Sequence, residues 1–179
     1  ALPGGCAIGA RPVNLHLFGL EALGAGFSID NGYIRGFVKG KLQGTRIDFP
    51  FKSVGATANI LMAAVLAHGK TSISNAAIEP HIVQLCDVLV EMGADISGIG
   101  TNELIIDGVE KLSPVEITVN PDMIEAGTFL MAGAMLGEIE LENVDPSHLT
   151  IVLEKLESAG CDISVATSSI GIKRSGMIN

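Results

Sequence analysis

The sequence has no tryptophan, one tyrosine and only 4% aromatic residues in a chain of 179. Proteins that bind single-stranded nucleic acid stack the bases on aromatic side chains, so this scarcity argues against such a surface. Basic residues are few as well, because 11 Lys and Arg stand against 20 Asp and Glu for a formal net charge of -9. A phosphate backbone needs clustered positive charge. The composition therefore predicts no nucleic-acid partner.

Long apolar runs and closely spaced cysteines are also lacking. The longest apolar stretch, residues 60–67, is too short to span a membrane. No basic region followed by an apolar one marks a signal peptide at the N-terminus. The three cysteines are widely spaced and form no CxxC pair, which argues against a zinc or dithiol centre. Together these features predict a cytoplasmic protein with no membrane partner.

Apolar residues and glycine are plentiful. The chain is 47% hydrophobic and carries 22 glycines. It can therefore bury a sizeable core, with many tight turns and close backbone approaches.

A pattern occurs three times along the chain, anchored on Gly24, Gly93 and Gly160, which stand 69 and 67 residues apart. In each copy a helical apolar run stops at the glycine, as a left-handed helix cap requires, and two short strand-like runs follow. The two later copies also carry an earlier helix with a strand candidate on either side. These helices are residues 57–68 and 124–136, with strand candidates at 44–49, 71–75, 115–119 and 138–143.

The complete unit thus reads strand, helix, strand, helix, strand, strand, and the first copy has only its second half. The fold class is α/β, of the α+β kind. Both earlier helices are apolar almost all round, which predicts that they are buried. We expect helices inside, sheets outside, and units packed around a common axis. The best boundary is near residues 108–114, with the crossing near Asn120 and Pro121, and we expect the chain to begin in the middle of a unit.

One candidate for chemistry is Cys6, which stands in a glycine-flanked loop. A cation such as Arg11 would lower the pKa of the thiol and make it a nucleophile or an acid. The alternative for Cys6 is a small buried hydrophobe. Arg11 itself either holds a phosphate or carboxylate or makes a surface salt bridge. Cys86 lies in the helical run 82–92, and Cys161 stands where the other copies of the repeat have alanine. Core packing is favoured for both.

A second candidate is the junction at residues 52–57, where a strand turns into a helix. Unpaired N–H groups with a lysine and a hydroxyl beside them suit a diphosphate, whereas the simpler interpretation is an N-cap by Ser53. Asp122 and Glu125 are expected to be helix-dipole partners. The four histidines have no metal-ligand spacing, and we expect solvated or capping roles for them: His16, His68, His81 and His148. The residues alone predict a repeat protein with a candidate reactive thiol and two candidate anion sites.

Several stretches resemble a known family. Residues 1–15, ALPGGCAIGARPVNL, are similar to the catalytic loop of UDP-N-acetylglucosamine 1-carboxyvinyltransferases, which are enolpyruvyl transferases. Three more family motifs follow in order: FKSVGAT at 51–57, NAAIEP at 75–80 and PDMIEAGTF at 121–129. The cysteine in PGGCxIGxRP is specific, because the related shikimate-pathway transferase lacks that loop.

The resemblance implies transfer of enolpyruvyl from phosphoenolpyruvate to the 3-hydroxyl of UDP-N-acetylglucosamine, with release of phosphate. This step begins peptidoglycan synthesis, and thus serves cell-wall biogenesis, cell shape and cell division. No metal or organic cofactor is implied. By the same resemblance Cys6 is the general acid toward the phosphoenolpyruvate methylene and is alkylated by fosfomycin. Arg11 would hold the phosphate, while Pro12, Val13, Asn14 and Leu15, and Phe51, Lys52, Ser53, Val54 and Gly55, would contact the UDP-sugar.

The family fold has two domains, each an inside-out α/β barrel of three such units. Residues 1–119 would be one and a half units of the catalytic-loop domain, and residues 120–179 the first unit of the other. Family members are more than twice this long, so the partners of this segment include the missing parts of the same enzyme. We expect the 179 residues alone to be inactive.

Two interpretations of other classes remain. One is a non-catalytic nucleotide-sugar-binding protein on the same scaffold. The other is a cysteine-based redox sensor, which would need a second thiol near Cys6.

Overall fold

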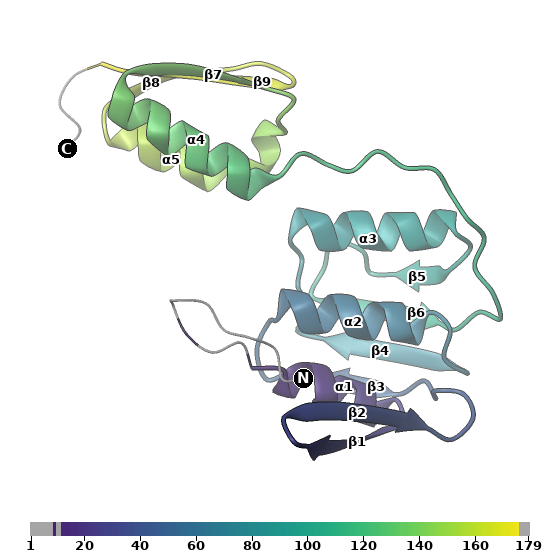
Figure 1. The fold of residues 1–179 in the computed structure, drawn as a ribbon. Coiled ribbons are helices and arrows are strands. Elements are labelled where there is room, and N and C mark those ends of the chain that lie inside the picture. The colour runs from purple at the N-terminus through teal and green to yellow at the C-terminus, as the bar shows by residue number, and fades with distance from the viewer. Residues whose placement is uncertain (1–8, 10–11, 176–179) are drawn as a thin grey trace. The chain divides into compact units, whose positions relative to one another are not determined.

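The computed structural model describes Gly9 and residues 12–175 and divides the chain into two compact units, residues 1–118 and 119–179. We describe each unit by itself (Figure 1).

The first unit opens with a helix and a hairpin. Helix α1 (Asn14–Ala22) is followed by the antiparallel strands β1 (Ala25–Asp30) and β2 (Tyr33–Val38). Asn31 and Gly32 join the strands with φ values of 49° and 77°, the positive pair that a tight two-residue hairpin turn requires. The half-unit predicted for the first copy is confirmed.

A complete unit follows, with the elements in the predicted order. They are β3 (Arg46–Asp48), α2 (Val54–Ala64), β4 (Lys70–Ser74), α3 (Pro80–Glu91), β5 (Asp95–Ser97) and β6 (Glu103–Asp107). The sheet order is β3-β4-β6-β5, with β3 and β4 parallel and the other pairs antiparallel. Helix α2 ends four residues before the predicted end, because His68 leaves the helix to bridge Gln43.

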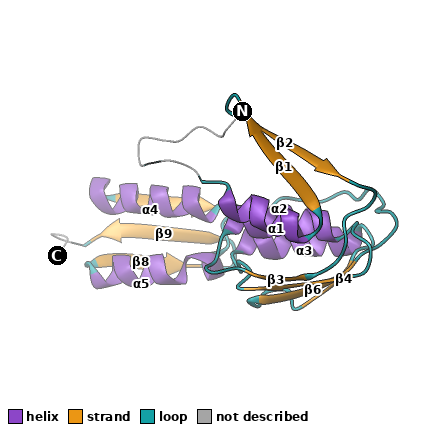
Figure 2. Cartoon of the chain, turned by 90° about the horizontal axis from the view of Figure 1, so that it is seen from below, coloured by secondary structure: helices purple, strands orange, loops and turns teal. Residues whose placement is uncertain are grey.

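The three helices of the first unit cover one face of the four-stranded sheet (Figure 2). Apolar side chains from both layers form the core between them, and the fully buried ones include Ile47, Ile60, Ile73, Leu104 and Ile106. This burial supplies most of the driving force for the unit.

The second unit repeats the pattern without a first strand. Its elements are α4 (Met123–Leu136), β7 (Glu138–Glu142), a 3-10 turn η1 (Pro146–Leu149), α5 (Thr150–Ser158), β8 (Cys161–Val165) and β9 (Ser169–Arg174). The sheet order is β7-β9-β8, and both pairings are antiparallel. The core joins α4 to the sheet through Leu130, Ile170 and Ile172.

The predicted glycine caps are confirmed in all three copies. Gly24, Gly93 and Gly160 follow the last turns of α1, α3 and α5 with φ values of 99°, 104° and 97°. This is the left-handed region in which glycine has no Cβ penalty.

Two predictions are wrong in part. Residues 115–119 form no strand. Among the strands of the described residues β7 pairs only with β9, and an alternating pattern without a neighbouring strand has no ladder to join. Helices α2 and α4 are also not buried all round. Met62 on α2 is 47% exposed and Met135 on α4 is 69% exposed, since in this chain each helix packs on a sheet with one face only.

Candidate functional site

The segments predicted to bind the nucleotide sugar lie at the starts of two neighbouring helices. Residues 12–15 lead into α1, and residues 51–55 lead into α2. Cys6 and Arg11 lie outside the described residues. Residues 12–15 and 51–55 lie within the described part of the chain.

The start of α2 has the features of an anion site and of a helix cap together. Ser53 is the N-cap: its Oγ accepts the Ala56 N–H at 3.4 Å and its carbonyl accepts the Thr57 N–H at 2.9 Å. Within the described part of the chain, the N–H groups of Val54 and Gly55 have no partner. Lys52 beside them is exposed. The cap that the sequence favoured is confirmed, and two N–H donors are left available to a ligand.

The start of α1 presents backbone more than side chains. Val13 is the N-cap, has no side-chain cap, and accepts the Leu17 N–H at 3.0 Å through its carbonyl. Leu15 is only 7% exposed and belongs to the core, whereas Asn14 is exposed. Of residues 14 and 15, only Asn14 can therefore offer its side chain to a ligand.

Helices α1 and α2 approach closely where Gly19 faces Ile60. A Cβ on Gly19 would lie 2.6 Å from Ile60 Cδ1, so only glycine fits there without a shift. Three residues earlier on α1, His16 meets α2 twice: its Nδ1 is 2.7 Å from Asn59 Nδ2, and its ring lies against Gly55. The sequence predicted a solvated or capping role for His16. Its contact with Gly55 depends on tertiary packing and leaves no local signal.

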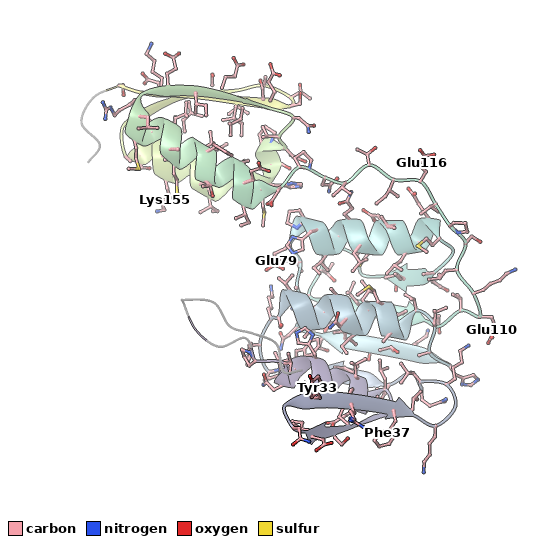
Figure 3. All side chains as sticks on the ribbon, viewed as in Figure 1. Tyr33, Phe37, Glu79, Glu110, Glu116 and Lys155 are labelled. Carbon is pink, nitrogen blue, oxygen red and sulfur yellow. The ribbon has the colours of Figure 1, made fainter. Side chains whose placement is uncertain are left out.

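The start of α3 is tied to the same end of the unit. Thr57 is fully buried in the first turn of α2, and its Oγ1 accepts the Ala77 N–H at 3.0 Å from the loop that leads into α3. The helices α1, α2 and α3 thus begin near one another, because His16 near the start of α1 contacts α2 and Thr57 joins α2 to the loop before α3. Glu79 is the N-cap at the start of α3 (Figure 3). Among the residues that the structure describes, its buried Oε2 has no hydrogen-bond partner.

Replacing Thr57 tests this link between α2 and the loop before α3. Thr57→Val keeps the shape but leaves the buried Ala77 N–H without an acceptor, and we expect a loss of about 1–3 kcal/mol in the free energy of unfolding. Thr57→Ser keeps the hydroxyl and should cost less. Urea denaturation followed by circular dichroism measures both, and a larger loss for the serine variant would contradict the link.

The cysteines within the described residues are both core residues, as predicted. Cys86 and Cys161 are 1% and 4% exposed. Burial, with Asp87 nearby, raises the pKa of the Cys86 thiol to about 11. The reactive form of cysteine is the thiolate, so Cys86 is inert at neutral pH.

The acids at the start of α4 have the expected role. Asp122 is the N-cap, and its Oδ1 accepts the N–H groups of Ile124 at 2.8 Å and Glu125 at 3.4 Å. Glu125 lies in the first turn, where a negative charge is favourable. Over residues 9 and 12–175, no three His, Cys, Asp or Glu side chains gather as a metal site, and no helix is long and apolar enough to cross a membrane.

Comparison with known proteins places the chain in a family. The profile of the EPSP synthase (3-phosphoshikimate 1-carboxyvinyltransferase) family matches residues 1–178. UDP-N-acetylglucosamine 1-carboxyvinyltransferase from Shewanella amazonensis is 54% identical over 177 residues, which are 98% of this chain and 42% of that protein. The protein of the same name from Chlorobium limicola is 56% identical over 172 residues, 95% of this chain and 41% of its own length.

Solved structures agree on the fold. The enolpyruvyl transferase NikO from Streptomyces tendae superposes with a TM-score of 0.79 at 22% identity, covering 92% of this chain and 42% of that one. EPSP synthase from Acinetobacter baumannii has a TM-score of 0.69 at 26% identity, covering 92% of this chain and 40% of its own. The chain spans about two-fifths of the length of the relatives it matches. It is a member of the EPSP synthase (3-phosphoshikimate 1-carboxyvinyltransferase) family.

Proposed function

We propose that this chain is the catalytic-loop segment of a UDP-N-acetylglucosamine 1-carboxyvinyltransferase. The activity is transfer of enolpyruvyl from phosphoenolpyruvate to the 3-hydroxyl of UDP-N-acetylglucosamine in the cytoplasm, with release of phosphate, as the first committed step of peptidoglycan synthesis. The observation that carries this proposal is identity of 54% over 98% of the chain to a protein of that name. The geometry at the start of α2 supports it, because two N–H donors are available where a diphosphate would bind.

Each proposed residue has a role that suits its chemistry. Cys6 would protonate the methylene carbon of phosphoenolpyruvate, and Arg11 would hold the phosphate as its charge develops. Residues 12–15 would contact the nucleotide, mainly through backbone atoms. Residues 51–55 would bind the diphosphate at the start of α2. Neither a metal nor an organic cofactor enters this scheme.

The finer architecture is part of the same proposal. Residues 1–119 would belong to one inside-out barrel and residues 120–179 would open a second, with helices facing the barrel interior. The exposed apolar faces of α2 and α4 support this arrangement. Met62, Met131, Met135 and Leu136 are 47%, 53%, 69% and 85% exposed, and an apolar helix face of this kind needs a cover. Further units of a longer protein would provide it.

Fosfomycin labelling tests whether Cys6 is the reactive thiol. The Cys6 thiolate would attack an epoxide carbon, so that a C–S bond forms as a C–O bond breaks. We expect mass spectrometry of the intact chain and its peptides to find one adduct, on Cys6, more quickly in the presence of UDP-N-acetylglucosamine. Cys86 and Cys161 serve as internal controls, because both are buried.

Two outcomes would contradict the proposal. Equal labelling of all three thiols would show that Cys6 is merely accessible. If the nucleotide sugar does not change the labelling rate at Cys6, then the Cys6 loop does not respond to the proposed site at α1 and α2. The latter result would favour the non-catalytic binding protein if the nucleotide sugar still binds.

A further inference from the structure

One face of the hairpin β1-β2 carries aromatic and basic side chains that the proposed function does not use. Successive side chains of a strand point to opposite faces, so Tyr33, Arg35 and Phe37 of β2 share one face. Tyr33 and Phe37 are labelled on this strand in Figure 3. The register places three small or acidic β1 residues opposite them: Asp30, Ser28 and Gly26. We call these six residues the aromatic face.

The two rings of this face are open to solvent. Tyr33 is 56% exposed and Phe37 is 60% exposed, in a chain with only 4% aromatic residues. A Cβ on Gly26 would lie 2.6 Å from Phe37 Cε2, so the Phe37 ring lies across the glycine. Covering a strand glycine explains where the ring lies. A ring held in this way also loses little conformational freedom when a partner binds.

The repeat shows that the aromatic face is the outward face of the hairpin. Counted from the capping glycines of the two copies, Gly26 corresponds to Asp95 and Phe27 corresponds to Ile96. In the complete unit Ile96 packs against the core, whereas Asp95 is exposed. The aromatic face therefore corresponds to the solvent side of the four-stranded sheet, and it would stay open if a further helix and strand completed this half-unit.

The same stretch is basic in an acidic chain. Residues 31–47 contain four Lys and Arg and no Asp or Glu, whereas the whole chain has a formal net charge of -9. Two of the four cations pair with nearby acids. Arg35 Nη2 lies 4.0 Å from Asp30 Oδ2, and an exposed pair of this length is weak enough to exchange for another carboxylate. Lys39, directly after β2, has no ion-pair partner among the described residues.

The spacing and composition of the aromatic face favour a protein segment as its occupant. Side chains at every second position of a strand recur roughly every 7 Å, and an extended polypeptide has the same repeat. Tyrosine, phenylalanine and arginine are the residue types that protein interfaces concentrate. A lipid surface is recognised by clusters of about four or more cations. Arg35 and Lys39 are too few for that.

We propose that the aromatic face binds an extended acidic segment of a partner protein, in which apolar and acidic side chains alternate at every second residue. Arg35 pairs with an acidic side chain of the segment, and Tyr33 and Phe37 bury the apolar side chains on either side of it. Lys39 pairs with the next acid. This inference does not depend on the proposed transferase activity, because it uses none of the residues at the helix starts.

A synthetic peptide is the probe, with leucine and glutamate taking turns at every second position and serine between them. We titrate the ¹⁵N-labelled chain with this peptide and follow the backbone amide shifts. Saturable shifts are expected at residues 33–37. A peptide with lysine in place of each glutamate should bind about 10-fold more weakly or less, because its charges repel Arg35.

Variants on the two faces of the hairpin locate the binding surface. Phe37→Ser and Arg35→Glu should each weaken peptide binding about 10-fold or more, as for residues central to an interface. Ile29→Ser is the matched control for Phe37→Ser, because Ile29 is 63% exposed on the opposite face of the same hairpin. Lys155→Glu makes the same charge change as Arg35→Glu on α5. Neither control should change the affinity.

The outcomes are decisive even if Phe37→Ser loosens the hairpin, since Arg35→Glu alters only an exposed side chain. Equal binding of the lysine peptide, or equal loss in Ile29→Ser and Phe37→Ser, would overturn the proposal. No saturable binding of the glutamate peptide would overturn it as well, and cosedimentation of the chain with phosphatidylglycerol vesicles would then assign the aromatic face to a lipid surface.

Discussion

Replacing Gly133 by alanine is expected to lower the free energy of unfolding of the second unit by about 1–3 kcal/mol, the usual cost of overpacking a core. Gly133 lies on the buried face of α4, against the sheet. A Cβ there would lie 2.8 Å from Ile172 Cγ2 and still closer to Ile139. Ile172 is 1% exposed and is held in the core, so the helix would have to move away from β7 and β9.

Gly127 on the same helix is the matched control. A Cβ at this position would lie 3.7 Å from Leu149 Cδ2, which is ordinary contact. Gly127→Ala should therefore be neutral, or stabilising by up to about 1 kcal/mol through helix propensity. Urea denaturation, with amide exchange at Ile170 and Ile172, measures both variants. Equal stability of the two would mean that α4 does not depend on a close approach to the sheet.

Turnover should depend on Cys6 by a large factor when the chain is placed within a full-length relative. The chain can replace the matched segment of the Shewanella amazonensis relative, to which it is 54% identical over 177 residues. We expect this chimera to release phosphate from phosphoenolpyruvate in the presence of UDP-N-acetylglucosamine. Cys6→Ala should lower the rate by about 10²–10⁴-fold, the usual contribution of a general acid. The 179 residues alone should release none.

The controls keep this experiment decisive. Circular dichroism and thermal unfolding must show the chimera folded, and Cys161→Ala should keep most of the rate because Cys161 is a core residue. A folded chimera that binds the nucleotide sugar and releases no phosphate would support the non-catalytic binding protein. Phosphate release by the 179 residues alone, lost in Cys6→Ala, would overturn the expectation that they are inactive.

Much of the fold could be predicted from local signals. Gly24, Gly93 and Gly160 mark the ends of three helices, and all three adopt the left-handed backbone that this position favours. The order of strands and helices in the complete unit followed from the same repeat. Such signals are readable because helix caps and hairpin turns depend on a few neighbouring residues.

Predictions that depended on distant partners were weaker. The alternating pattern of residues 115–119 resembles a strand, but in the described part of the chain β7 pairs with β9 and not with these residues. The apolar faces of α2 and α4 predicted complete burial, yet Met135 is 69% exposed in this chain. In both cases the pattern indicates the kind of neighbour that the residues could pack against. Whether that neighbour is present depends on distant parts of the chain.

The candidate site divides in the same way. The segments 12–15 and 51–55 were predicted from motifs, and the Ser53 cap from residue type. By itself the sequence determined the repeat, the helix ends, the core character of Cys86 and Cys161, and the family resemblance, because each is written in short stretches of chain. Only the tertiary structure decided that His16 lies against Gly55 and Asn59, because that contact depends on how closely Gly19 lets α1 approach Ile60 on α2.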